Sequence, residues 1–508
     1  MVTLLERNAA IITTPRGVSI FVALVLVSLG LIRVFLFPGV GGDDSEQLVF
    51  SQFISWGYQI RNPPLVTWLL IGVQKITGPT VLSIVALRMA ILFGIYLLTL
   101  NITRRLCDDP RLAALSAGSL LMVFYMGWNT IHGFTHTSLV TFFYLSALLM
   151  VLRIKQSASP INLGLLGVIL GIGLLAKYSF LLFAIALLCA SLADQDLRRK
   201  LMSPWLLFGF VLILPLLIPQ AQWLIDHAPP NHLVRGEADL NWWDNARRFG
   251  KGTLRLMLSL IGFLLPLWIF WLAVFWKAVR SPVTPTDSQR RDMKLFKRLF
   301  IILLAMAVGA IFVIQSDRIR SHYMFILIPF VPYFFLRFGN AFTTLQIQRF
   351  AAVISLAGVT LIATLIGKYF IEPLVCGTCE DHIPYDSFAK QVRDAGFKQG
   401  TIFAFFHKDP LAGNFRVRFP DARVVSAKHP AVVAPKNRPD AQCLIIWPVI
   451  GVVEPKSATL LTANQSYMQT GLSFTHPSTV ITAILPPYRN TPHQLEFILL
   501  NEGAGNCR

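Results

Sequence analysis

Three acidic residues lie within four positions of one another, directly after an apolar run that is long enough to cross a bilayer. They are Asp43, Asp44 and Glu46, in the segment GGDDSEQLVFSQFISWGYQIRNPPLVTWLL, residues 41–70. A carboxylate is costly at a membrane edge, so acids placed there are more often functional than incidental. Such a group can accept a proton from an attacking hydroxyl or hold a metal ion. A solvated loop is the alternative, but the proline pair and the aromatic residues of this segment favour a shaped loop.

Two histidines follow in the segment WNTIHGFTHTS, residues 128–138. His132 and His136 are four positions apart, which on a helix places both rings on one face. That pair can bind a metal, or it can serve in hydrogen bonding and proton transfer. No HExxH pattern accompanies the pair, and this favours the second role.

A set of mainly cationic residues stands at predicted helix ends on the same side of the membrane. Arginine makes paired contacts with phosphate, and a lysine at a helix end either extends to the polar interface or pairs with an anion. On the side predicted to face outward these residues run against the positive-inside rule, so we expect them to bind a phosphate. A solvated loop is the alternative for the arginines. The set comprises Lys177 and Tyr178 in GIGLLAKYSF (171–180), and Arg318, Arg320 and His322 in QSDRIRSH (315–322).

Membrane helices must position these residues. Of the 508 residues 54% are hydrophobic and 14% are charged, whereas about a quarter are charged in a soluble chain. We predict a polytopic α-helical membrane protein with about 11 transmembrane helices. The basic loops then place the N-terminus in the cytoplasm and the C-terminus outside, so the net charge of +19 reflects loop anchoring and not nucleic-acid binding. The predicted spans are 18–37, 80–102, 112–127, 136–152, 161–176, 179–193, 204–224, 253–276, 299–314, 323–336 and 350–370.

The composition changes after about residue 370, where proline and charged residues return. Short β-like runs and a helix-like stretch that ends at Gly396 predict a C-terminal extracytoplasmic α/β domain. The β-like runs are 401–406, 422–425, 443–449 and 479–485, and the helix-like stretch is 385–396. We assign residues 1–372 to a transmembrane domain with outer loops 38–79, 225–252 and 315–322, and residues 373–508 to the α/β domain. In an oxidising compartment we expect structural disulfides among its cysteines, which are Cys376, Cys379, Cys443 and Cys507.

The first outer loop, with SQFISWGYQIRNPPLVTWLL after the acid pair, resembles that of bacterial GT-C glycosyltransferases. It is most similar to the family that contains protein O-mannosyltransferases and the aminoarabinose transferase of lipid A. GIGLLAKYSFLLF is similar to the GLGLLxKY segment of that family, and the resemblance covers residues 18–340. Within the family, HTSL, RIRSHYMFILIPFVPYF and PYDSFAKQVRDAGF resemble the branch that adds galacturonic acid to lipopolysaccharide.

This resemblance implies an inverting transfer of one sugar from a polyprenyl-phosphate donor to lipopolysaccharide core or lipid A. The reaction is expected at the periplasmic face of the bacterial inner membrane. The leading loop acid of the family falls on Asp43, beside Asp44, and its helix-end lysine falls on Lys177. The place of the second family acid is held by His136, which departs from a two-carboxylate pattern.

The site residues then fall into three expected roles, without a metal ligand and with a divalent metal left open as a cofactor. The catalytic residues are Asp43, Asp44 and His136; those for the donor phosphate are Lys177, Tyr178, Arg318, Arg320 and His322; those for the substrate are Glu46, Tyr58, Arg61 and His132.

Three other functions fit the same pattern. They are a protein O-glycosyltransferase of the same fold, a transporter or flippase of anionic lipid-linked sugars, and a non-catalytic assembly protein. The absence of an internal sequence repeat, the few charges inside the spans and the C-terminal domain count against transport.

Overall fold

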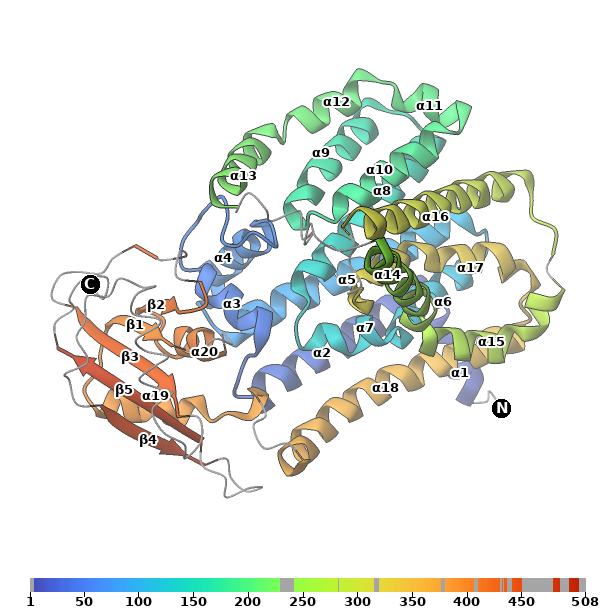
Figure 1. Ribbon diagram of the computed structural model, residues 1–508. Coiled ribbons are helices and arrows are strands. Elements are labelled where there is room, and N and C mark those ends of the chain that lie inside the picture. Colours follow the sequence, from blue (N-terminus) through green and yellow to red (C-terminus); the bar gives the residue numbers. More distant parts are fainter. Residues whose placement is uncertain are drawn as a thin grey trace.

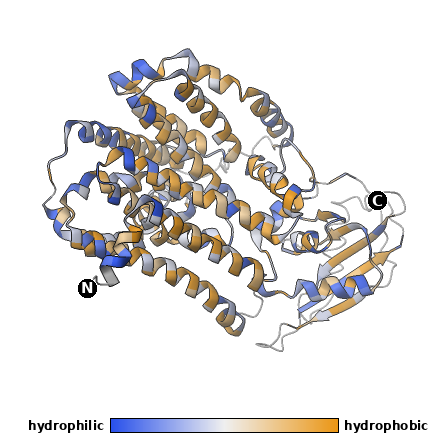
Figure 2. Ribbon diagram, turned by 180° about the vertical axis from the view of Figure 1, so that it is seen from behind, coloured by the Kyte–Doolittle hydropathy of each residue, from blue (hydrophilic) through white to orange (hydrophobic). Residues whose placement is uncertain are grey.

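A long helical bundle and a smaller α/β domain make up the computed structural model of the protein (Figure 1). The structure describes residues 4–228, 242–281, 283–314, 319–375, 380–405, 410–429, 432, 434–435, 441–449, 478–484 and 493–501. Hydrophobic residues cover the bundle helices along their length, and hydrophilic residues gather at the bundle end that lies away from the α/β domain (Figure 2). The predicted fold class, a polytopic helical protein with a C-terminal α/β domain, is confirmed.

Several bundle helices begin at the place where the sequence supplies a start signal. Thr14, Asp109 and Ser159 each precede a proline and accept a hydrogen bond from a backbone N–H of the first helical turn. The helices of this part are α1 (Leu4–Ile12), α2 (Pro15–Leu36), α3 (Gly42–Phe50), α4 (Leu65–Thr77), α5 (Val81–Leu106), α6 (Pro110–Ser119), η1 (Leu120–Met122), α7 (Phe124–Gly127), η2 (Asn129–Ile131), α8 (Thr135–Gln156), α9 (Pro160–Ala176), α10 (Phe180–Leu192), α11 (Gln195–Leu201), α12 (Pro204–Val211), α13 (Leu214–His227), α14 (Trp242–Phe263), α15 (Leu265–Arg280), α16 (Asp287–Ile314), η3 (Ser321–Phe330), α17 (Val331–Phe338), η4 (Gly339–Ala341) and α18 (Thr344–Val375).

Six helices of the described chain are long and apolar enough to cross a membrane, or up to 10 if each bent pair of helices forms one span. The expected count of 11 is therefore not confirmed. The difference is α9, which has 17 residues and is grouped with the shorter apolar helices. Helix α9 nevertheless packs along α8 and α12 within the bundle.

The α/β domain contains one mixed sheet with the strand order β2-β1-β3-β5-β4. Strand β1 pairs in parallel with β2 and β3, and β5 runs antiparallel to β3 and β4. Its elements are η5 (Glu380–His382), α19 (Tyr385–Asp394), β1 (Gly400–Ala404), α20 (Pro410–Arg418), β2 (Arg423–Ser426), β3 (Gln442–Pro448), β4 (Thr479–Ala483) and β5 (His493–Leu500). The four predicted strands and the predicted helix 385–396 are present, and Gly396 has a φ of 103°, as a helix C-cap requires.

The fifth strand, β5, was missed in the sequence, although it is eight residues long and turn-type residues stand on both sides of it, RNTP before and NEG after. Cys443 on β3 is disulfide-bonded. The other three cysteines of the predicted disulfides, Cys376, Cys379 and Cys507, lie outside the described residues.

Helix α3 is the element that joins the two parts. It packs against α4 of the bundle on one side and against α20 and β2 of the α/β domain on the other (Figure 1). The acid cluster therefore sits at the junction of the membrane bundle and the C-terminal domain.

Candidate active site

The acid pair at the start of α3 is divided between two environments. Asp44 is 1% exposed and accepts two hydrogen bonds from Arg88 Nη1, at 2.6 Å to Oδ1 and 2.8 Å to Oδ2. Arg88 lies on α5, is fully buried, and donates from Nη2 to the backbone oxygen of Ile131 at 2.9 Å. The carboxylate of Asp44 thus anchors α3 to the bundle.

Arg88 was missed in the sequence, although a signal for it exists. It is a single arginine inside the predicted span 80–102. A charge in a membrane span is costly unless a partner neutralises it. An arginine inside a predicted span therefore predicts an acidic partner, such as Asp44.

Asp43 occupies the preceding position in the first turn of α3, which turns its side chain about 100° away from that of Asp44. Its side chain is exposed. Loss of hydration beside the surrounding protein, together with the charges of Glu46 and Asp44, raises the pKa of Asp43 above its ordinary value. A raised pKa makes this carboxylate a stronger base than a free aspartate.

Lys177 follows the last residue of α9 and extends toward α8. Its Nζ donates a hydrogen bond to Thr137 Oγ1 at 2.8 Å. Burial lowers the pKa of Lys177 to about 8, and the Asp43 carboxylate acts in the opposite direction. Asp43 and Lys177, which lie far apart in the sequence, are therefore electrostatic neighbours.

Of the residues predicted to bind the donor phosphate, the structure places Lys177, Arg320 and His322 near one another. His322 at the start of η3 lies within the electric field of Lys177 and Arg320. Its ring packs against Phe134, with centroids 5.3 Å apart. Phe134 has a φ of 63°, in the left-handed region that is costly for a residue with a side chain, and such strain clusters at functional sites. Arg318 lies outside the described residues.

His136 lies on α8, 6% exposed, and is also within the field of Lys177. Within the described part of the chain, neither of its ring nitrogens has a hydrogen-bond partner of normal geometry. The buried ring thus lies close to the end of α9, where Lys177 stands. Lys177 thus interacts through its charge with Asp43, His136 and His322, and we call these four residues the Asp43 site.

The remaining predicted residues lie around this site with partners of their own. Glu46 contacts His429 of the α/β domain, with 2.7 Å between Oε1 and Nε2. Tyr58 is buried and its hydroxyl donates to the backbone oxygen of Phe53 at 2.6 Å, so it shapes its own loop. Tyr178 accepts a hydrogen bond from Gln220 at 2.8 Å. Arg61 is exposed on the first loop.

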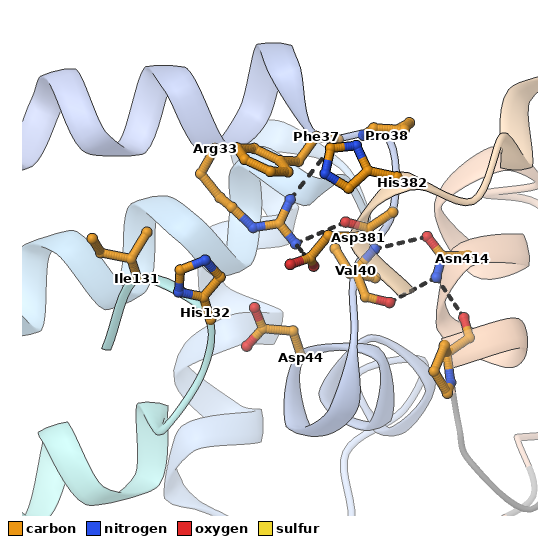
Figure 3. Close-up of polar contacts among 12 residues, drawn as sticks. Arg33, Phe37, Pro38, Val40, Asp44, Ile131, His132, Asp381, His382 and Asn414 are labelled. Carbon is orange, nitrogen blue, oxygen red and sulfur yellow. Dashed lines mark hydrogen bonds and ion pairs between the residues drawn. The ribbon is translucent and has the colours of Figure 1, made fainter. Parts of the chain in front are cut away.

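His132 belongs to a second polar group that ties the α/β domain to the bundle. Arg33 of α2 is 1% exposed and donates to Asp381 Oδ1 at 3.1 Å (Figure 3). Lys368 of α18 contacts Asp381 Oδ2 at 2.8 Å. Burial raises the pKa of Asp381, but the charges of Arg33 and Lys368 outweigh it and hold that pKa below its ordinary value. His132 packs on Trp128, with centroids 5.1 Å apart, and faces these charges.

The two expected histidine roles are thus separated, since His132 faces the Arg33 group and His136 faces Lys177. No group of three or more His, Cys, Asp or Glu residues with the geometry of a metal site occurs in the part of the chain that the structure describes.

The sequence is similar to that of known proteins over part or most of its length. Residues 61–223 match the family model of the dolichyl-phosphate-mannose-protein mannosyltransferases. The lipopolysaccharide core galacturonosyltransferase RgtA of Rhizobium johnstonii is 26% identical over 453 residues, which cover 87% of this chain and 88% of that protein. RgtB of the same organism is 25% identical over 414 residues, 80% of this chain and 81% of that protein.

The fold also has a solved counterpart. The crystal structure of ArnT from Cupriavidus metallidurans bound to undecaprenyl phosphate matches with a TM-score of 0.52 and 14% identity, over 94% of this chain and 97% of that one. The apo structure of the same protein matches equally well. The resemblance expected from the first loop and the Lys177 segment is thereby confirmed. The chain is thus a multi-pass membrane protein with the fold of that glycosyltransferase structure, and its sequence is similar over most of its length to the lipopolysaccharide core galacturonosyltransferases.

Proposed function

We propose that the protein transfers a single galacturonic acid from a polyprenyl-phosphate donor to a hydroxyl of the lipopolysaccharide core, with inversion, at the periplasmic face of the inner membrane. The observation that carries this proposal is the charge interaction between Asp43, in the first turn of α3, and Lys177, whose Nζ is held by Thr137 Oγ1 just after α9. A proton acceptor and a cation, both at one end of the bundle, are the two groups that displacement of a lipid phosphate by a hydroxyl requires. The names of the two rhizobial relatives support the choice of sugar and acceptor.

In the proposed reaction the acceptor oxygen forms a bond to the anomeric carbon while the bond from that carbon to the phosphate oxygen breaks. Asp43 takes the proton of the acceptor hydroxyl. The electron pair of the broken bond leaves with the polyprenyl phosphate, whose growing charge is stabilised by Lys177 and Arg320. Preorganised charges of this kind usually supply the largest single contribution to catalysis. Attack from the side opposite the leaving group inverts the anomeric configuration.

The residues around Asp43 and Lys177 have supporting roles in this proposal. His136 takes the place of a second acid, and as a buried ring in the field of Lys177 it supports the position of that lysine. His322 stands with Lys177 and Arg320 at the phosphate. Asp44 does not enter the chemistry, because its carboxylate is held by Arg88.

Mass analysis of the product tests this function. Purified protein is incubated with polyprenyl-phosphate galacturonic acid and lipopolysaccharide core, with a matching mannose donor and an acceptor protein as parallel arms. We expect the core to gain the mass of one galacturonic acid residue. A mass gain only on the protein acceptor would instead indicate a protein O-glycosyltransferase, as the name of the family model suggests. Movement of the donor across vesicles without any mass gain would indicate a flippase.

A further inference from the structure

The α/β domain is fastened to the segment that carries the acids. Asn414 of α20 exchanges two hydrogen bonds with the backbone of Val40, at 3.0 and 2.8 Å. The backbone N–H of Gly413 donates to Ser45 Oγ at 2.9 Å. A Cβ at Gly413 would lie 2.2 Å from that oxygen, so helix α20 reaches this contact only because position 413 lacks a side chain.

A second set of contacts fixes strand β2 over the same segment. Gln52 imitates a neighbouring strand, because its side chain donates to the backbone oxygen of Val424 at 2.8 Å and accepts from the N–H of Val424 at 2.8 Å. Beyond the end of β2, His429 contacts Glu46 at 2.7 Å and its ring packs edge-on against Phe50, with centroids 4.9 Å apart. Strand β2 is thus held by the turn that follows α3, and His429 just beyond the strand is held by α3 itself; Lys428 lies between these two contacts.

Lys428 is exposed and directly precedes His429, whose Nε2 lies 2.7 Å from Oε1 of Glu46 on α3, so the chain carries Lys428 to the acid segment. Its charge also lowers the pKa of Asp43, as the smallest of the contributions to that pKa. Asp43 therefore has a cation from each part of the molecule, Lys177 from the bundle and Lys428 from the α/β domain. In the proposed function Lys177 faces the lipid phosphate that leaves. The acceptor must approach from the opposite side, and Asp43 must touch its hydroxyl.

We propose that Lys428 binds a carboxylate or phosphate group of the acceptor glycolipid, and that the α/β domain thereby forms part of the acceptor site. This inference rests on the proposed function. A role in acceptor binding would explain why several contacts hold the α/β domain against α3. An ammonium group on a flexible stem suits an acceptor anion, because it acts as a point charge and tolerates small differences in position.

Steady-state kinetics of Lys428→Gln, Lys428→Arg and a control, Lys390→Gln, test the inference. Lys390 is an exposed lysine on α19 of the same domain, so its substitution removes the same charge away from α3. For Lys428→Gln we expect the KM for lipopolysaccharide core to rise about tenfold, the size of a lost charge-assisted hydrogen bond, with the donor KM and kcat unchanged. Lys428→Arg should keep most of the affinity, and Lys390→Gln should behave as the wild type.

Two chemically altered acceptors identify the anion. If phosphatase treatment of the core removes the difference between wild type and Lys428→Gln, the group is a phosphate. If reduction of its carboxyl groups removes the difference, the group is a carboxylate. A difference that survives both treatments would overturn the inference, and so would a change confined to the donor KM or to kcat. The last result would show that Lys428 only adjusts the charge of Asp43.

Direct binding separates this inference from the proposed function. Titration of the donor-free protein with delipidated core oligosaccharide should give weaker binding for Lys428→Gln than for the wild type. If that difference appears but the wild type transfers no galacturonic acid, the proposed reaction is wrong and the anion site stands. If transfer occurs and binding is equal in both proteins, the reaction stands and the anion site is wrong.

Discussion

Arg88 Nη1 lies 2.6 Å from Oδ1 and 2.8 Å from Oδ2 of Asp44, and both residues are buried. Because of this contact, two acids that are adjacent in the sequence have different roles. Asp44 fixes α3 in the bundle, and its neighbour Asp43 is left to face the site. An acid pair that suggests a shared carboxylate function in the sequence is therefore one anchor and one candidate base.

We predict that Asp43→Asn removes transfer while leaving the fold intact. The amide keeps the shape of the side chain but cannot take the acceptor proton, so the rate should fall about a thousandfold, within the usual range for loss of a general base. The thermal unfolding temperature should match that of the wild type. Full transfer by Asp43→Asn to a hydroxyl acceptor would remove Asp43 as the base.

Asp44→Asn should have the opposite profile and act mainly on stability. It leaves the buried Arg88 guanidinium without a countercharge, at a cost of about 3–5 kcal/mol. Replacement of both partners, Asp44→Leu with Arg88→Met, should recover much of that loss in a thermal unfolding assay. Equal unfolding temperatures for Asp44→Asn and Asp43→Asn would contradict the division of duties.

Arg33 and Asp381 provide a separate test of how the two parts of the molecule are joined. Asp381→Ala leaves Arg33 and Lys368 without their shared acid. We expect a loss of roughly 3 kcal/mol in stability and faster proteolytic cleavage near the junction of α18 and the α/β domain. The control is Asp196→Asn, which breaks an exposed pair with Lys200 and should cost less than about 1 kcal/mol. Similar effects of the two variants would argue against a tether at Asp381.

Long apolar helices could be predicted from the sequence. Residues whose role depends on charge pairing or tertiary contacts were predicted less well. Spans were identified by length and hydropathy, and only the 17-residue α9 left the count unresolved. Two residues that act at the acid segment from other parts of the chain, Arg88 and Lys428, were missed in the sequence. Their partners lie 44 and 385 positions away along the chain, and only tertiary folding brings them to α3.

The pH profile of transfer should reveal Lys177. Its pKa is lowered to about 8 from an ordinary 10.5, chiefly by burial. The protonated form stabilises the leaving phosphate, so kcat/KM should fall as the pH rises through about 8. The acidic limb should belong to Asp43, whose raised pKa means that the base is lost by protonation at a higher pH than for a free aspartate.

Lys177→Arg is the variant that isolates the basic limb. Arginine keeps its charge throughout the accessible pH range, so the fall near pH 8 should disappear even if overall activity is lower because the contact with Thr137 is changed. A basic limb that remains near pH 8 in this variant would assign it to another group.

The last prediction concerns the close approach of α20 to α3. Gly413→Ala places a Cβ 2.2 Å from Ser45 Oγ and 2.4 Å from Ser45 Cα, so the two helices must separate. Transfer should fall at least tenfold, because separation moves β2 and Lys428 away from Asp43, whereas Gly309→Ala on α16, where a Cβ meets nothing within 4 Å, should be neutral. Adding Ser45→Ala should not rescue Gly413→Ala, since the backbone of Ser45 also blocks the new methyl group. Rescue by that second change would show that only the hydroxyl is in the way and that the helices need not move apart.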